Sequence, residues 1–440
     1  MEGRTYIKYE RKDSMASELS VETIRKKLIG KKLSYEEIYS VIDDLVKDRL
    51  EDIFLAYFLG AGFARGFSDE ELYFMVKAMV ETGEKIKFSG IVADKHSTGG
   101  VAGTRTTMIL VPIIAACGFK IPKTSSRAIT SPAGTADVME VLSPVTFTED
   151  KIKKMIGKVG GCIVWGGSLN IAPADDKMIE VERPLNFESF DNIVFSIMAK
   201  KVALGATHLV LDIPVGPTMK IQHYEDAEKI AKKFKYIADR FKIKLSVDVN
   251  YTQEPAGRGA GPVLEVRDVF AILEQRKDRS LVLEKKALRL TGKLIDLCMS
   301  EKKGVGKEIR RRYEKVGESG EKLAKEVLES GEALRKMREI IKVQGGDGKV
   351  SFDSFELGSQ KVEIEAKKSG EVVTIDNKVL TAFCRLLGSP EDKKAGVYLV
   401  KKIGDKVSKG DTLFRMYSSD RWRLQEAVKE GRDIVLYKID

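Results

Sequence analysis

The chain has 440 residues, 43% hydrophobic and 32% charged, which is enough for two or three domains with apolar cores. Its net charge of +10 comes from 76 basic and 66 acidic residues, mixed along stretches such as 321–339, which is typical of solvated helix faces and not of a nucleic-acid surface. The charged start at 1–12 contains no signal peptide, and no apolar run reaches the roughly 18 residues of a membrane span. The four cysteines form no C-x-x-C pair and are expected to be reduced core thiols, so we expect a cytoplasmic protein that binds neither nucleic acid nor membrane.

The first expected elements are helices. After a flexible N-terminal stub over residues 1–18, Ser34 and Ser68 each stand three residues before a glutamate, the spacing of a capping box. Apolar residues follow each box at helical spacing. Residues 19–85 are therefore predicted to form a small helical bundle.

From Gly90 onward the pattern changes to short apolar runs separated by amphipathic stretches. The runs, predicted as strands, are 109–116, 162–165, 208–213 and 244–249, and the stretches, predicted as helices, include 149–159 and 224–241. This alternation is typical of βαβ units around a mostly parallel sheet.

The last part of the chain divides into two kinds of pattern. Residues 262–342 are predicted to be helical, and after the glycines at 345–348 the chain becomes strand-like, at 370–373 and 397–411. The predicted fold class is α/β plus α: a small helical domain, a large α/β domain with a mostly parallel sheet, and a C-terminal α+β domain over residues 345–440.

Two glycine- and hydroxyl-rich loops flank the apolar run at 108–117. The first covers residues 95–100 (KHSTGG) and the second residues 125–135 (SSRAITSPAGT). Glycine lets backbone amides approach a ligand, and amides, hydroxyls and a Lys or Arg aimed at one point make an anion cradle. Two such loops predict sites for two phosphate-like groups, or for one phosphate and a sugar.

These loops carry a family resemblance. Residues 95–101 resemble the phosphate loop of thymidine and pyrimidine-nucleoside phosphorylases, and 126–140 resemble the second signature of that family. Segments 122–127, 160–167 and 172–176 resemble the archaeal AMP phosphorylases in particular, and 257–262 and 404–410 are similar to the family. The resemblance spans roughly residues 20–440. It implies a helical domain of residues 19–85 and about 175–205, and an α/β phosphate-binding domain of residues 86–174 and 206–340.

The activity that the resemblance implies is phosphorolysis, in which inorganic phosphate attacks C1′ of the ribose while the base departs. Such an enzyme needs a phosphate cradle, a clamp for the nucleotide and an acid near the base. The expected phosphate-binding residues are Lys95, Ser97, Gly99, Gly100, Thr107 and Thr135. A structural alternative is that Ser97 and Thr135 only cap helices.

The resemblance also assigns nucleotide-binding residues. These are Gly100, Ser126, Arg127, Ala128, Ile129, Thr130, Ser131, Thr135, Arg183, Ser196, Lys200 and Lys220. The guanidinium fork of Arg127 suits a 5′-phosphate, or else it forms a salt bridge within the domain. Ser196 and Lys220 match AMP-contacting positions of the AMP branch, whereas Ser196, Lys200 and Arg183 match base-contacting positions of the thymidine branch, so both branches stay open.

Two residues are candidates for the acid. The family has an aspartate after an Arg/Tyr-Pro-Leu motif, and this chain has Glu188 at that position, after 183–185. His96 in the first loop is either a second candidate or a structural hydrogen-bonding residue. Asp175 and Asp176 are interpreted as turn formers or supporting groups.

No metal or organic cofactor is expected, because the three histidines show no ligand spacing; inorganic phosphate is the only co-substrate. The predicted function is phosphorolysis of nucleoside 5′-monophosphates (AMP, also CMP and UMP) to free base and ribose 1,5-bisphosphate. The alternative is a thymidine or pyrimidine-nucleoside phosphorylase that forms (deoxy)ribose 1-phosphate, which Thr98 and Arg183 favour.

Two further rivals are weighed. A phosphoribosyltransferase of the anthranilate type would need an acidic metal-pyrophosphate site, which the sequence does not show, and a nucleotide-binding regulatory protein would bind without turnover. Archaeal AMP phosphorylases carry an extra N-terminal domain that drives large assemblies, and only residues 1–18 precede the bundle here. We therefore expect a homodimer and no larger assembly.

Overall fold

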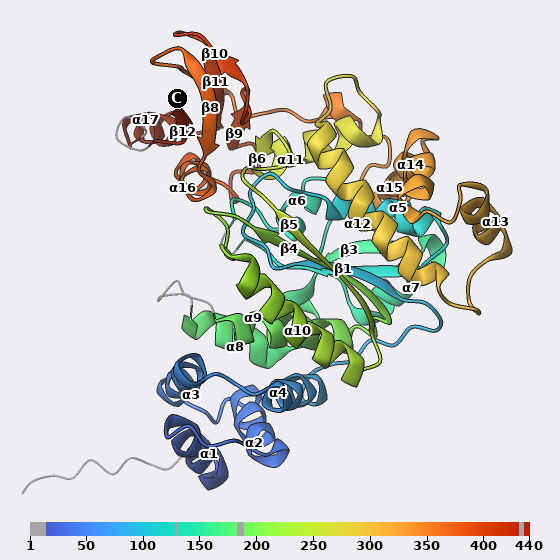
Figure 1. Cartoon of the computed structure of the whole chain (residues 1–440), viewed down its shortest axis with the longest axis vertical. Helices are drawn as coiled ribbons and strands as arrows, with labels where there is room; N and C mark the ends of the chain where they lie inside the picture. The colour runs from blue at the N-terminus through green and yellow to red at the C-terminus, as the bar shows by residue number, and fades with distance from the viewer. Residues whose placement is uncertain (1–14, 129–130, 183–188, 431–434) are drawn as a thin grey trace, which may run out of the picture. The chain divides into compact units, whose positions relative to one another are not determined.

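The structure, a computed structural model of the chain, describes residues 15–128, 131–182, 189–430 and 435–440. They form two compact units (Figure 1). The helical unit comprises residues up to 86 together with 170–204 and 232–241, and the larger unit comprises 87–169, 205–231 and 242–440. Four buried, free cysteines are present, as predicted. Among the described helices, none is both long and apolar enough to cross a membrane.

The helical unit is built as its capping signals predict. Both boxes form, since Ser34 and Ser68 accept from the backbone of Glu37 and Glu71, whose carboxylates accept in return. Its helices are α1 (Glu18–Leu28), α2 (Tyr35–Val46), α3 (Asp52–Arg65), α4 (Asp69–Glu81), α8 (Pro173–Glu182) and α9 (Phe190–Ala203).

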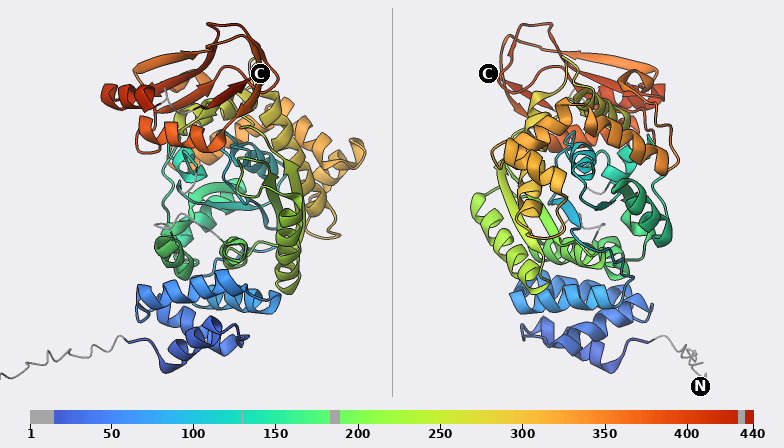
Figure 2. Two further views of the ribbon diagram at one scale, coloured as in Figure 1. Left: turned by 60° about the vertical axis from the view of Figure 1, so that its left-hand side comes forward. Right: turned by 90° about the vertical axis from the view of Figure 1, so that its right-hand side faces the viewer.

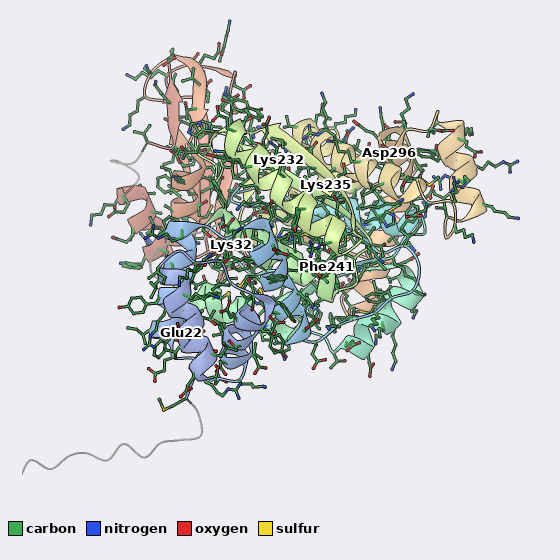
Figure 3. All side chains as sticks on the ribbon, turned by 60° about the horizontal axis from the view of Figure 1, so that its bottom comes forward. Glu22, Lys32, Lys232, Lys235, Phe241 and Asp296 are labelled. Atoms are coloured by element: carbon green, nitrogen blue, oxygen red, sulfur yellow. The ribbon has the colours of Figure 1, made fainter. Side chains whose placement is uncertain are left out.

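The core of this unit joins segments far apart in the sequence. Phe67 contacts both Phe58 of α3 and Phe195 of α9 with tilted or edge-on rings, and such aromatic pairs add packing energy to area burial. The end of α10 (Tyr224–Arg240) belongs to the same unit, where Lys232 and Lys235 are exposed on its outer face (Figure 3). The mixed charges on this helix are thus a solvated face.

The larger unit is organised around parallel strands. β1 (Ala93–Ser97), β4 (His208–Val215) and β5 (Lys244–Tyr251) form one parallel sheet in the order β1-β4-β5, and β2 (Ile121–Ser125) pairs in parallel with β3 (Gly161–Trp165). A parallel bridge between Val92 and Lys120 joins β1 to β2. The carboxyl ends of β1, β4 and β5 therefore lie at one edge, the usual place for a ligand in such sheets.

Helices cover these strands, and one of them lies where the sequence predicted a strand. They are α5 (Thr107–Ala116), α6 (Thr135–Met139), α7 (Glu149–Val159), α11 (Pro262–Leu273), α12 (Leu281–Met299), α13 (Lys307–Lys315), α14 (Gly320–Glu329) and α15 (Glu332–Val343). The run 109–116, predicted as a strand, is the helix α5, which contacts α12, α14 and α15 (Figure 1). Because residues 107–115 are all buried, the helix shows no amphipathic period that would separate it from a buried strand.

The C-terminal part is α+β, as predicted, and has its own apolar core (Figure 2). Its antiparallel sheets have the orders β6-β9-β11-β7 and β10-β8-β12. The elements are β6 (Gly259–Ala260), β7 (Gln360–Glu365), β8 (Gly370–Ile375), α16 (Asn377–Leu387), β9 (Gly396–Leu399), β10 (Lys406–Val407), β11 (Thr412–Ser418), α17 (Arg421–Glu430) and β12 (Tyr437–Ile439). β6 comes from the loop before α11, so the C-terminal sheet includes a piece of the preceding segment.

Candidate active site

The first glycine loop connects β1 to α5 at the carboxyl edge of the sheet. At its start, the Ser97 hydroxyl donates to Asp212 Oδ2 (2.9 Å) and the Thr98 amide donates to the Asp212 carbonyl (3.0 Å). The Gly99 amide donates to Ser97 Oγ (3.3 Å). Asp212 lies opposite Ser97 on the neighbouring strand β4, so strand register places these predicted residues at one point.

The two glycines of this loop are required by its conformation. Gly99 and Gly100 have φ of +85° and +83°, a region that other residues rarely adopt. A Cβ on Gly100 would lie 2.9 Å from Cγ of Lys220. The structure therefore brings Lys220, predicted to bind nucleotide, against the predicted phosphate loop.

The start of α5 presents threonine hydroxyls. Thr107 is buried, and Thr106 stands at the N-cap of α5 without a side-chain capping bond. Within the described residues, the buried Oγ1 atoms of Thr98 and Thr106 have no hydrogen-bond partner. Buried hydroxyls are normally paired, and the positive end of a helix favours an anion. Thr106 was missed from the sequence, although a threonine directly before a helix is a recognisable capping signal.

Beneath the loop, two lysines share one carboxylate. Lys95 Nζ lies 3.9 Å from Asp212 Oδ2, and Lys286 Nζ of α12 lies 3.3 Å from Asp212 Oδ1, which also accepts from Asn250 (2.8 Å). Burial lowers the pKa of Lys95 to about 8, against the opposing effect of Asp212. Burial acts to raise the pKa of Asp212, but Lys286 and Lys95 bring it below its usual value. Two cations against one anion leave this edge electropositive.

The second loop is folded by a carboxylate and a glycine. Asp137 Oδ2 accepts from the amides of Ala128 (2.7 Å) and Gly134 (2.8 Å). A Cβ on Gly134 would lie 2.3 Å from the Ser126 carbonyl oxygen, so the two ends of the loop approach closely. Ser131 donates to the Ala133 carbonyl (2.9 Å). The predicted residues Ile129 and Thr130 lie outside the described part of the chain.

Arg127 is engaged by acidic side chains. Its guanidinium donates to both carboxylate oxygens of Glu140 (2.8 and 2.7 Å) and to Asp137 (3.0 Å), and it lies 5.0 Å from the Trp165 ring centroid. Hydrogen bonding from Arg127 is the main reason that the pKa of Glu140 falls to about 2. The salt bridge weighed as the alternative to 5′-phosphate binding is therefore present in this structure.

A buried arginine that the sequence analysis did not single out connects the two loops. Arg105, 8% exposed, donates to Glu265 (2.6 Å), to the Thr135 hydroxyl (2.9 Å) and to the Ala133 carbonyl (2.9 Å). Burial raises the pKa of Glu265, and Arg105 opposes that rise. Because Thr135 Oγ1 accepts from Arg105, its own proton is left to donate elsewhere. No spacing rule marks such a residue, since its partners are distant in the sequence.

Some predicted residues belong to the helical unit. Asp175, 1% exposed, accepts from the Ser196 hydroxyl (2.9 Å) and pairs with Lys200 Nζ (2.5 Å). The carboxylate thus orients both predicted nucleotide-binding side chains, as a supporting group would. Arg183 and Glu188 are outside the described residues.

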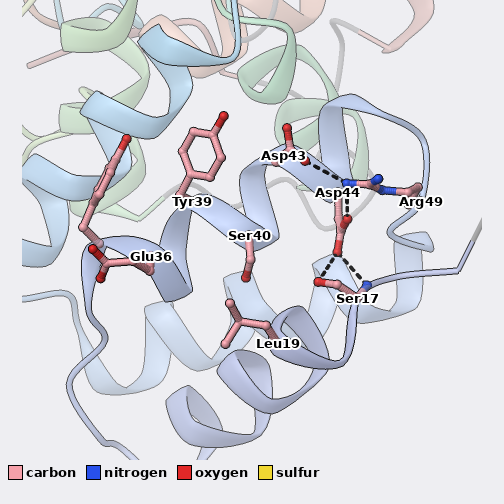
Figure 4. A pocket seen from close by; sticks show the side chains of 9 residues that line it. Ser17, Leu19, Glu36, Tyr39, Ser40, Asp43, Asp44 and Arg49 are labelled. Carbon is pink, nitrogen blue, oxygen red and sulfur yellow. Dashed lines mark hydrogen bonds and ion pairs between the residues drawn. The ribbon is translucent and has the colours of Figure 1, made fainter.

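Three further features of the described residues bear on the predictions. His96 is half-buried on β1, opposite Leu211 of β4. No group of three or more His, Cys, Asp or Glu side chains in the described residues is arranged to hold a metal ion. A hollow of about 380 Å³ lies between α1 and α2 (Figure 4). It contains none of the predicted site residues, and its lining includes Ser17, Asp44 and Arg49, which bond to one another.

Known proteins share this architecture and sequence. Residues 21–83 match the helical bundle domain of a glycosyl transferase family, residues 89–259 match its a/b domain, and residues 371–438 match the pyrimidine nucleoside phosphorylase C-terminal domain. The chain is 43% identical to the AMP phosphorylase of Methanocella arvoryzae over 94% of this chain and 79% of that protein. It is 41% identical to the AMP phosphorylase of Methanocaldococcus jannaschii over 96% of this chain and 80% of that protein.

A solved structure of low sequence identity shares the fold of this chain. The crystal structure of anthranilate phosphoribosyltransferase from Thermus thermophilus matches with a TM-score of 0.56 and 18% identity, over 73% of this chain and 99% of that one. At this identity the likeness concerns the arrangement of elements and not the reaction.

The Arg105–Glu265 pair generates a stability prediction. Arg105→Leu leaves the Glu265 carboxylate, 1% exposed, buried without its cation, so the free energy of unfolding should fall by about 3–5 kcal/mol. The double variant Arg105→Leu/Glu265→Leu should recover part of the loss. Denaturant unfolding measures both, with the exposed pair Arg415–Glu363 as a control in which Arg415→Leu should change stability far less. Equal stability of the wild type and Arg105→Leu would contradict a structural role for this buried pair.

Proposed function

This chain belongs to the AMP phosphorylase family, and we propose that it cleaves nucleoside 5′-monophosphates with inorganic phosphate, giving a free base and ribose 1,5-bisphosphate. Membership makes it a glycosyltransferase, and the family resemblance seen in the sequence motifs is confirmed by relatives that match more than nine-tenths of the chain. The observation that supports the proposal most is the end of β1 together with the loop that follows it, which combine a buried lysine, three glycines with positive φ and two buried threonine hydroxyls without a partner among the described residues.

In the proposed reaction, a phosphate oxygen forms a bond to C1′ as the bond from C1′ to the base nitrogen breaks. The electron pair of that bond leaves with the base, which takes up a proton. The protein's task is to hold phosphate and sugar in line and to stabilise the departing charge. The chemistry requires no electron transfer, and inorganic phosphate is the co-substrate.

We assign the attacking phosphate to the first loop. Its proposed ligands are Lys95, Ser97, Gly99, Gly100, Thr107 and Thr135, to which we add the Thr106 hydroxyl, because it is buried without a partner among the described residues. Lys95 is held ready for this role, because a cation that is only partly neutralised by Asp212 gains from a nearby anion in a buried environment.

We assign the nucleotide to the second loop and its neighbours. The proposed ligands are Gly100, Ser126, Arg127, Ala128, Ile129, Thr130, Ser131, Thr135, Arg183, Ser196, Lys200 and Lys220. Arg127 would bind a 5′-phosphate with the N–H groups that remain beside its bonds to Glu140 and Asp137. The Asp175 carboxylate supports Ser196 and Lys200.

The substrate proposal predicts a ranking of rates. AMP, CMP and UMP should be cleaved with a higher kcat/KM than adenosine, uridine and thymidine, since the 5′-phosphate supplies binding energy that the nucleosides lack. Base release is followed for the whole panel with and without phosphate. A preference for thymidine would favour the pyrimidine-nucleoside alternative, and base release that does not need phosphate would contradict phosphorolysis.

For the proton donor we propose Glu188, with His96 as the second candidate. Glu188→Gln keeps size and hydrogen bonding but cannot give up a proton as an acid, so turnover should fall roughly 10²–10⁴-fold with nucleotide affinity retained. Glu188→Asp should keep part of the activity, since aspartate is the family's residue. Near-full turnover in Glu188→Gln together with an inactive His96→Gln would transfer the role to His96.

We further propose a cytoplasmic homodimer. The four cysteines are free and buried, as expected in a reducing compartment. In the helical unit, α3 exposes Ile53 (58%), Tyr57 (55%) and Phe63 (58%); Ile53 and Tyr57 are four residues apart and share one helix face, an exposed apolar surface of the kind that associates. Sedimentation velocity at micromolar protein should give twice the chain mass, shifted toward monomer in Tyr57→Lys. A monomeric wild type, or a particle larger than a tetramer, would refute the proposal.

A further inference from the structure

The first loop is held by a residue more than 250 positions away. Asn377, the first residue of α16, is 3% exposed. Its Oδ1 accepts from the Ala102 amide (2.8 Å), and its Nδ2 donates to the Gly100 carbonyl. The Asn377 carboxamide thus bonds to the loop on both sides of Val101. We call this pair of hydrogen bonds the clamp.

This double contact sets the direction of two consecutive peptide groups. In a trans peptide, the C=O and the N–H point in opposite directions. With the Gly100 carbonyl turned toward α16, the Val101 N–H points away from it, and with the Ala102 N–H turned toward α16, the Val101 carbonyl points away. No described residue accepts a hydrogen bond from the Val101 amide, so the clamp directs a donor that these residues do not use.

Packing fixes the loop beyond Val101 but not the peptide groups on either side of Val101. The orientation of these peptide groups therefore depends on Asn377. The Ala102 side chain lies in the apolar core of the C-terminal part. A Cβ on Gly103 would lie 2.5 Å from the Gly259 carbonyl oxygen, and the Gly257 amide donates to the Gly103 carbonyl (2.8 Å). The glycines at 99 and 100 supply no side chain to restrict their own rotation.

We propose that Asn377 is a positioning residue for phosphate: it holds the Val101 amide in the orientation that binds the attacking anion. The C-terminal α+β part then contributes directly to the active site instead of serving only as a structural appendage. The inference rests on the proposed function, in which this loop binds phosphate.

Asn377→Asp tests the clamp with almost no change of shape. The variant keeps an oxygen that accepts from Ala102, but it places a second, charged acceptor against the Gly100 carbonyl in place of a donor. Leaving a buried polar group unsatisfied predicts a rise in the KM for phosphate of about ten- to a hundredfold. The KM for the nucleotide should rise less than the KM for phosphate, because Gly100 is one of many proposed nucleotide ligands and the clamp does not touch the second loop.

The same helix offers matched controls. Thr381 is 8% exposed, and its hydroxyl donates only to the Asn377 carbonyl within α16, so Thr381→Val perturbs α16 without touching the loop. Lys378 is exposed beside Asn377. Thr381→Val and Lys378→Ala should both retain the wild-type KM for phosphate. Asn377→Ser, which is neutral and smaller, serves as the second variant if Asn377→Asp does not fold.

Three readouts separate the outcomes. Phosphate-dependent cleavage by the wild type is established first, and its absence refutes the proposed function and this inference with it. With wild-type activity present, a selective rise in the phosphate KM, and a weaker thermal stabilisation by phosphate in the absence of nucleotide, support the clamp. A folded Asn377 variant with the wild-type phosphate KM overturns it, and so does a rise equally large in Thr381→Val.

Discussion

The site depends on fixing the conformation of one irregular loop so that its amides stay available to a ligand. The segment between β1 and α5 forms neither helix nor strand, so its amides must find other partners or be held free for a ligand. Three side chains fix its conformation: Asp212 at its start, Asn377 at its middle and Arg105 at its end. These groups come from β4, from α16 and from the loop itself, through Glu265 of α11. The parallel sheet supplies the edge, and the C-terminal part completes it.

The charges beneath this loop favour the anion that is proposed to bind there. Lys95 is buried beside a carboxylate that it shares with Lys286, and burial holds its pKa near 8. Asp248 stabilises further cations at the same edge, since it pairs with Arg289 (2.9 Å) and Lys293 (2.7 Å). At the second loop the positive and negative charges nearly cancel, because Glu140 and Asp137 pair with Arg127 and also with Lys393. The excess positive charge therefore lies beneath the first loop.

What could be predicted from the sequence followed local signals. The capping boxes, the glycine-rich loops and the motif order predicted the helical bundle, the parallel strands and the two loops that are proposed to bind anions, because each depends on residues close together in the chain. The run 109–116 was assigned to a strand because a helix buried on every side has no polar face. Thr106 has a local signal that was overlooked, a threonine directly before a helix, whereas Arg105 and Asn377 were missed for a different reason. Their roles arise from partners tens to hundreds of positions away, and one sequence contains no signal for such contacts.

A crystal structure of the protein with bound phosphate tests the central claim most directly. The account predicts an anion at the start of α5, within hydrogen-bonding distance of Lys95 Nζ and Thr106 Oγ1, with the Val101 amide directed at it and Asn377 still bonded to Gly100 and Ala102. Phosphate bound away from this loop, or a loop whose amides turn toward protein acceptors when phosphate is present, would contradict it.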